Sequence, residues 1–292
     1  MKNAYWLIRG ELWENRAIWI APASIGVLSV LAALFGKADV DASAGVPPYR
    51  MVGGLLLFAF GIVFFLAMSI YSAWYLLDSL HTERKDHSIL FWKSLPITDA
   101  ETVLAKLATA LIVIPLVYFA AADVTTVLIA FIVSVRASSW FGASLWRADL
   151  WLQLQALWVY LIVTSAVWFL PVAGWLMLIS AWARRALGLW SILPPLALIW
   201  AERAFFGTGH VAAALSARLF TGYPGTAFHG LTETLLRAAG AGGADPSFAS
   251  VDVWTLLDPA DFLRSPATWT GLAIGAALIV GTIRIRSRAV GL

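Results

Sequence analysis

Residues 82–106, TERKDHSILFWKSLPITDAETVLAK, form a charged segment between two long apolar runs. The first half of this segment predicts a short apolar helix over residues 89–92. Asp86 or Ser88 can cap that helix, because short polar side chains accept hydrogen bonds from the first free amides of a helix. The helix must end near Pro96, since proline disfavours the helical conformation in the residue before it.

The second half of the segment predicts the start of a longer helix. Thr98 followed three positions later by Glu101 is a capping box, and an apolar run follows it. Together the two halves predict a loop, a short helix with Phe91 and Trp92 on one face, a turn and a long helix.

The composition indicates a membrane protein. Of the 292 residues, 61% are apolar and 13% charged, against roughly 25% charged in soluble domains. The length allows about six spans of ~20 residues. The absence of cysteine excludes disulfides and thiolate chemistry. We therefore predict one all-α transmembrane domain over residues 1–292, with spans at about 17–35, 51–77, 103–135, 150–183, 187–206 and 267–283.

Two of the predicted spans exceed the thickness of a bilayer. The run 150–183 would measure ~51 Å as one helix, against a hydrocarbon core of ~30 Å. The helices over 103–135 and 150–183 must therefore tilt, or project from the membrane beside their short link. Prolines interrupt the hydrogen bonding of several spans.

The basic residues predict the orientation. With the amino end inside, the cytoplasmic pieces hold twelve of the twenty Lys and Arg residues, at more than twice the density of the outer pieces. The excess of Arg over Lys, with abundant Ala and Leu, suggests a bacterial source. We thus expect a multi-pass protein of the bacterial cytoplasmic membrane, with both ends and residues 78–102 in the cytoplasm.

The pieces outside the predicted spans contain apolar residues at helical spacing. Residues 1–16 predict an amphipathic helix in the inner interface, with Lys2, Arg9 and Arg16 on its wet face. The outer segment 201–265 predicts short helices between the fifth and sixth spans, because its apolar runs are too short to span a bilayer.

The charged segment also resembles a known family. The pattern E-R-x-x-x-S, four bulky apolar residues, x-S-L-P-I-T-x-x-E and a later Lys is similar to the segment after the second span of type-two ATP-binding-cassette (ABC) exporter permeases. The resemblance covers about 25 residues. The matching positions are Glu83, Arg84, Ser88, Ile89, Leu90, Phe91, Trp92, Ser94, Leu95, Pro96, Glu101 and Lys106.

The resemblance implies a transport subunit rather than an enzyme. In that family the segment is a coupling helix that docks on a separate ATPase subunit, which binds ATP and Mg²⁺. A second permease, the same or a relative, completes the transporter. The implied ATPase-contact residues are Glu83, Arg84, Ser88, Ile89, Leu90, Phe91, Trp92, Ser94, Leu95 and Pro96.

Two other functions compete with transport. The chain has no G-x-x-x-x-G-K-[ST] loop, so it cannot hold ATP phosphates itself. Asp78, His81, Glu83, Asp86 and His87 lie within ten positions, and a metal-dependent membrane enzyme acting on lipid could use such residues. A non-transporting anchor for a cytoplasmic partner is the third reading.

Two carboxylates lie in or beside predicted spans. A charge at bilayer depth is costly, so Asp123 and Glu202 are candidate functional residues. For Glu202, a pair with Arg203 or a role at a helix end is the simpler expectation. The substrate is not identified by the sequence. An almost uncharged bundle rich in Trp and Phe favours lipids, amphipathic peptides or hydrophobic drugs.

Overall fold

A computed structural model describes residues 2–36, 49–86, 97–136, 145–228 and 253–288. Most of these residues are helical, and in this part of the chain the one bridge between extended residues joins Phe228 to Leu257. The predicted all-α class is therefore confirmed.

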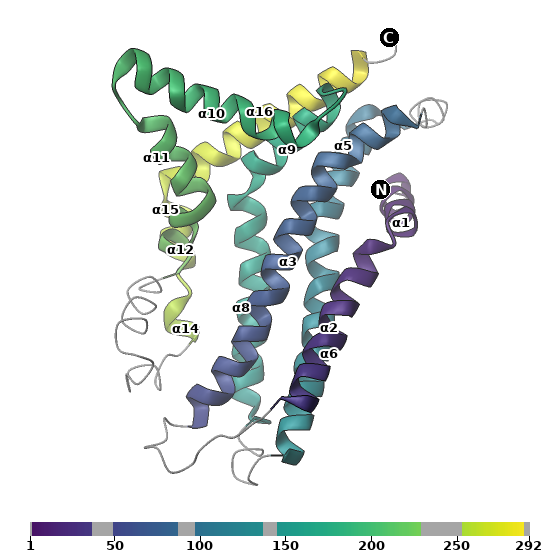
Figure 1. Cartoon of the computed structure of the whole chain (residues 1–292), viewed down its shortest axis with the longest axis vertical. Coiled ribbons are helices and arrows are strands. Elements are labelled where there is room, and N and C mark those ends of the chain that lie inside the picture. The colour runs from purple at the N-terminus through teal and green to yellow at the C-terminus, as the bar shows by residue number, and fades with distance from the viewer. Residues whose placement is uncertain (1, 37–48, 87–96, 137–144, 229–252, 289–292) are drawn as a thin grey trace.

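The elements follow one another as a series of long and short helices (Figure 1). In chain order they are α1 (Lys2–Glu14), α2 (Ala17–Phe35), α3 (Tyr49–Lys85), α5 (Asp99–Ala108), the π-helix η1 (Thr109–Val113), α6 (Ile114–Arg136), α8 (Ala148–Trp168), α9 (Leu170–Trp182), α10 (Leu187–Phe206), α11 (His210–Ser216), the π-helix η2 (Ala217–Thr221), α12 (Gly222–Ala227), α14 (Val253–Leu256), α15 (Pro259–Arg264) and α16 (Pro266–Arg288).

The main apolar core lies where α3, α6 and α9 meet. Phe64, Ile114, Tyr118 and Met177 are almost completely buried there. α2 packs along α6 on one side of this core, and α16 packs along α9 on the other. The outward faces of the same helices carry exposed Leu, Ile, Val and Trp side chains, as expected for a bundle surrounded by lipid.

Five helical stretches in the described ranges are long and apolar enough to cross a membrane. They are Ala17–Phe35, Phe60–Lys85, Asp99–Arg136, Ala148–Trp168 and Pro266–Arg288. Each overlaps one of the six predicted spans, so a multi-pass membrane bundle is supported, while a count of six spans is not.

The missing span is the predicted fifth one. A helix forms over the predicted residues, as α10 (Leu187–Phe206), but it is not among those five stretches. It crosses one end of the bundle at a large angle to α8, and none of its side chains is buried (Figure 1). Its two adjacent prolines, Pro194 and Pro195, lie near its middle.

The predicted fourth span is two helices rather than one. α8 ends at Trp168, Phe169 leaves the helical conformation with ψ near 5°, and α9 begins at Leu170. Pro171 explains the break, because it has no N–H to donate to the carbonyl four residues earlier and its ring crowds that position. This corrects the prediction of one continuous helix over 150–183.

The third span is continuous but contains a π-helix. α5, η1 and α6 together form a stretch of 38 residues, ~57 Å at 1.5 Å per residue, so it remains longer than the hydrocarbon core. Pro115 follows η1 and cannot donate to the carbonyl of Ala110, five residues earlier. The Ser72 hydroxyl of α3 donates to that carbonyl instead, at 3.0 Å.

α9 and α16 approach each other closely through glycines. A Cβ on Gly275 would lie 2.9 Å from Leu170 Cγ, and one on Gly174 would lie 3.1 Å from the carbonyl oxygen of Gly275. Gly271 and Gly275 are four residues apart on one face of α16, and small residues at this spacing are typical of tightly packed membrane helices.

The amino-terminal residues form a separate helix, and its predicted place in the membrane interface stays a prediction. α1 ends at Glu14, where the Asn15 side chain donates to the carbonyl of Glu11 at 3.2 Å. Leu7 and Glu11 are buried against the bundle, whereas Trp6 and Trp13 are 62% and 72% exposed. α1 lies at the same end of the molecule as the end of α3 and the start of α5 (Figure 1). The described part of 201–265 forms short helices after the end of α10, and their predicted place on the outer side stays a prediction.

Candidate functional site

Five charged side chains meet at the end of the bundle that carries α1 and the start of α5. Four of them are at most 10% exposed, and Asp99 is 23% exposed. They come from α1, α3, α5 and α16, so four separate helices contribute. We call the set the charge cluster: Glu11, Glu83, Asp99, Lys106 and Arg286.

Lys106 joins α5 to two other helices. Its Nζ lies 2.5 Å from Oε1 of Glu11 on α1 and 3.0 Å from Oε1 of Glu83 on α3. The Tyr75 hydroxyl donates to the second oxygen of Glu11 at 2.7 Å. A buried ammonium is tolerated only when it is paired and hydrogen-bonded, and these carboxylates provide both.

Arg286 joins the last helix to both ends of the predicted coupling segment. Its Nη1 lies 2.5 Å from Oε2 of Glu83, and its Nε lies 3.0 Å from Oδ1 of Asp99. Glu83 precedes residues 87–96 and Asp99 follows them. One guanidinium therefore joins a residue shortly before this stretch to a residue shortly after it.

The predicted capping box forms directly after residues 87–96, at the start of α5. The Thr98 hydroxyl accepts from the Glu101 amide at 3.1 Å, and the Thr98 amide donates to the Glu101 carboxylate at 2.9 Å. This confirms the sequence prediction for the start of α5. It also fixes Asp99 in the first turn, where a carboxylate interacts favourably with the helix dipole.

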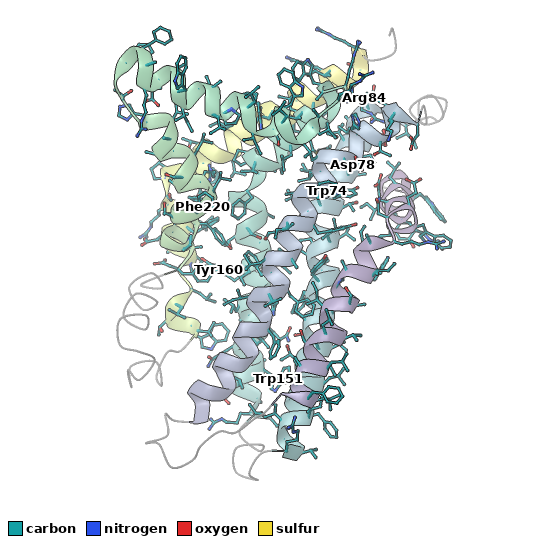
Figure 2. All side chains as sticks on the ribbon, viewed as in Figure 1. Trp74, Asp78, Arg84, Trp151, Tyr160 and Phe220 are labelled. Atoms are coloured by element: carbon teal, nitrogen blue, oxygen red, sulfur yellow. The ribbon has the colours of Figure 1, made fainter. Side chains whose placement is uncertain are left out.

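Arg84 caps a different helix. Its Nη2 donates to the carbonyl oxygens of Ser180 and Ala183 at the end of α9, at 2.5 and 2.8 Å. A cation at a helix carboxyl end satisfies free carbonyls and complements the dipole. The Ser180 hydroxyl in turn accepts from the backbone amides of Leu80 and His81. Figure 2 shows Arg84 at the end of α3.

The remaining residues predicted to contact an ATPase lie outside the described ranges. They are Ser88, Ile89, Leu90, Phe91, Trp92, Ser94, Leu95 and Pro96. Of that predicted set, the structure places Glu83 in the charge cluster and Arg84 against α9.

Sequence reasoning missed three members of the charge cluster, Glu11, Asp99 and Arg286. For Glu11 a signal was available, because it follows Leu7 by one helical turn and so shares the buried face of α1. An acidic residue on the apolar face of an amphipathic helix predicts a buried cation opposite it. For Arg286 no local signal exists, since a basic residue at the end of the last span also sets topology.

Glu14 lies one turn beyond Glu11 on α1. Partial burial raises the pKa of its carboxyl, and repulsion from the Glu11 carboxylate acts in the same direction. Folding therefore disfavours the ionised form of the Glu14 carboxyl.

The residues of the alternative metal site do not converge. Asp78 accepts from the Thr82 hydroxyl, His81 contacts the carbonyl of Ala183, and Glu83 belongs to the charge cluster. Among the residues that the structure describes, no group of three or more His, Asp or Glu side chains could hold a metal ion. His87 lies outside those residues.

The two other carboxylates have local partners. Gln155 of α8 donates to both oxygens of Asp123 on α6, at 2.9 and 3.0 Å. Glu202 accepts from the Thr208 hydroxyl and from the amides of His210 and Val211, each at 2.7 Å. Glu202 thus caps α11, which confirms the expected role at a helix end.

These features define an all-α membrane protein with a buried charge cluster at one end of its bundle. Comparison with protein-family models, with curated proteins and with solved structures finds nothing that matches the chain. Its function therefore has to be argued from its own residues.

Proposed function

We propose that the chain is the permease subunit of an ABC exporter, and that residues 87–96 dock on a separate ATPase. The resemblance of 83–106 to coupling segments motivates the proposal. The observation that carries it is the double contact of Arg286 with Glu83 and Asp99, which ties both ends of the segment to the last helix.

A coupling segment must transmit a force applied outside the membrane to the helices of the bundle. It can do so only if the segment does not bend away from those helices. Buried ion pairs resist such bending, because separating one leaves uncompensated charges, a cost of about 3–5 kcal/mol. In the proposed mechanism, ATP-driven closure of the ATPase pushes residues 87–96. Glu83 and Asp99 pass the force to α16, and Lys106 passes it to α1.

The proposal assigns two kinds of residue to the segment. Phe91 and Trp92 form the apolar surface that meets the ATPase. Glu83 and Arg84 anchor the segment to the bundle, since both already bind its helices. ATP and Mg²⁺ belong to the partner, and a second permease subunit completes the path. The transporter would reside in the bacterial cytoplasmic membrane, with the charge cluster on the cytoplasmic side.

The test is a mild-detergent pull-down of the tagged chain from its native membrane, with mass spectrometry of the proteins that accompany it. We expect a cytoplasmic protein with a Walker A loop, and any second permease in the same sample. Trp92→Glu should abolish recovery of the ATPase and leave membrane insertion unchanged. The matched control is Trp254→Glu, which alters an exposed tryptophan of α14, on the predicted outer side.

Two outcomes would count against the proposal: no ATPase with the unaltered chain, or full recovery of the ATPase with Trp92→Glu. ATP-dependent movement of a substrate across reconstituted vesicles then separates a permease from an anchor that only holds the ATPase.

A further inference from the structure

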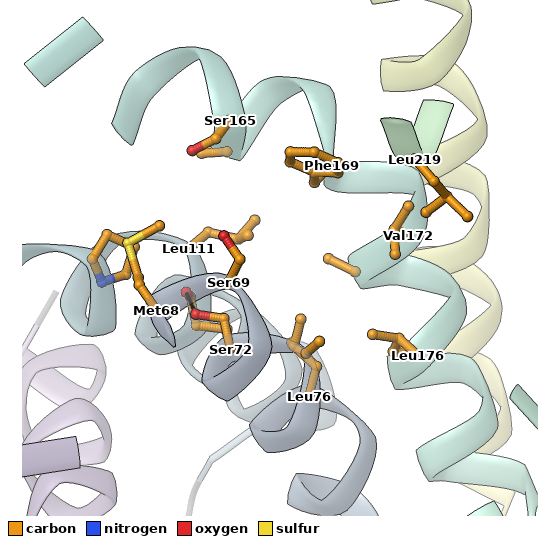
Figure 3. A pocket seen from close by; sticks show the side chains of 15 residues that line it. Met68, Ser69, Ser72, Leu76, Leu111, Ser165, Phe169, Val172, Leu176 and Leu219 are labelled. Atoms are coloured by element: carbon orange, nitrogen blue, oxygen red, sulfur yellow. Dashed lines mark hydrogen bonds between the residues drawn. The ribbon is translucent and has the colours of Figure 1, made fainter. Parts of the chain in front are cut away.

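A cavity of about 210 Å³ lies inside the bundle, away from the charge cluster. Its walls come from α3, from η1 with the start of α6, from the region where α8 meets α9, and from η2 at Leu219 (Figure 3). Among these, α3, η1 with α6, and α8 belong to helical stretches of spanning length, whereas α9 is shorter. The cavity therefore lies between helices that we expect membrane lipid to surround.

Small side chains create the cavity. Seven of its fifteen lining residues are Ala or Ser, contributed by several helices. Three departures from α-helical geometry border it: the π-helix η1 at Leu111, the break at Phe169 and the π-helix η2 at Leu219. Helix irregularities of this kind occur frequently at functional sites.

The cavity wall is apolar in spite of its three serines. The hydroxyls of Ser69, Ser72 and Ser165 each donate to a backbone carbonyl, of Phe65, Ala110 and Ile162 respectively. No charged side chain lines the space. A buried water needs two to four polar partners, so the wall suits a hydrocarbon group better than water or a polar solute.

The volume limits what can bind. A 150 Å³ apolar cavity accepts benzene, so 210 Å³ accommodates about eight carbons. Sites for drug-sized molecules are larger, about 300–1,000 Å³. Leu219, at one edge, is 43% exposed, so the cavity opens beside it. The space thus fits the end of one chain whose remainder lies outside.

We infer that this cavity is a binding site for one acyl chain of a membrane phospholipid. The inference is independent of the proposed transport function, since it rests on the cavity alone. A bound chain would contact Leu111 within η1 and Phe169 at the helix break, and so would support these two irregular stretches of backbone together.

The test uses the full chain in phosphatidylcholine vesicles whose lipids carry a diazirine near the end of one acyl chain. After illumination, mass spectrometry identifies the labelled residues. We expect label on Met68, Leu111 and Phe169 inside the cavity, in addition to Ile62 and Ile70. The last two are 59% and 72% exposed on α3 and report general contact with the bilayer.

The variant that tests the site is Ala73→Leu with Ala166→Leu. Each leucine adds three carbons to a space for about eight, so label inside should fall by about tenfold or more while label on the exposed residues persists. Ala23→Leu, on an exposed position of α2, is the matched control and should change neither. If the double variant does not fold, Ala73→Val alone should give a smaller fall.

Three results would overturn the inference. One is label confined to the exposed residues of the unaltered protein. Another is label inside the cavity that persists in a folded, filled variant. The third is label inside the cavity from a free diazirine fatty acid but not from the phospholipid. Because no ATPase is present, failure here leaves the transport proposal intact, and failure of the pull-down leaves this one intact.

Discussion

Replacing Lys106 by Met tests whether the charge cluster holds this end of the bundle together. The ammonium lies within 3.0 Å of both Glu11 and Glu83, and its side chain is 5% exposed. Methionine keeps most of the side-chain volume and removes the charge. Glu83 then retains Arg286, but Glu11 is left with two neutral donors, the Tyr75 hydroxyl and the Asn15 side-chain amide.

We expect Lys106→Met to lower the free energy of unfolding by about 3–5 kcal/mol, the range for removing one partner of a buried ion pair. Glu11→Gln together with Lys106→Met should recover part of this loss, because the variant no longer buries an unpaired carboxylate. Denaturation with sodium dodecyl sulfate in mixed micelles, followed by circular dichroism, measures the difference. Lys85→Met is the control, since Lys85 is exposed at the end of α3.

The reasoning is refuted if Lys106→Met costs less than about 1 kcal/mol, which is the range of an exposed pair. It is also refuted if the losses of Glu11→Gln and Lys106→Met simply add, since residues in one buried ion pair should couple by 0.5 kcal/mol or more.

Two further predictions concern packing and pH. Gly275→Ala should destabilise by about 1–3 kcal/mol, because its Cβ would meet Leu170 at 2.9 Å. Gly281→Ala, whose Cβ finds only ordinary contact at 3.5 Å, should be neutral or stabilising in the same assay. Glu14→Gln should raise the thermal midpoint at pH 8, because the folded chain raises the pKa of Glu14 and ionisation therefore opposes folding as pH rises. The gain should disappear near pH 4, where the unaltered carboxyl is largely protonated; an equal gain at both pH values would contradict this origin.

The features that could be predicted from sequence are those that depend on residues close together in the chain. The capping box at Thr98 and Glu101 needs only residues three positions apart. The helices over 17–35 and 187–206 have the predicted bounds, because apolar periodicity and flanking Gly or charge mark them locally. The residues of 187–206 alone do not determine whether that helix crosses the membrane. The prediction that it is a span is not supported.

The charge cluster could not be assembled from sequence. Lys106 and Glu11 are 95 positions apart, and Arg286 and Glu83 are 203 apart. Their pairing depends on how α1, α3, α5 and α16 pack. The helix break at Phe169 was hidden for a different reason: Pro171 lies in an unbroken apolar run, and hydropathy does not distinguish a kinked helix from two helices.

The contacts around residues 87–96 also determine which helices must respond if that segment moves. Arg286 ties the segment to α16, and α16 is locked to α9 by the close approach at Gly275. Arg84 and Ser180 independently tie the end of α9 to the end of α3. Contacts therefore connect Arg84 to α9, α9 to α16, and α16 to Asp99. α1 is joined to the cluster by Glu11, through Lys106 and Tyr75. A displacement of Glu83 or Asp99 relative to α16 must then either break an ion pair or carry α16, and with it α9, along.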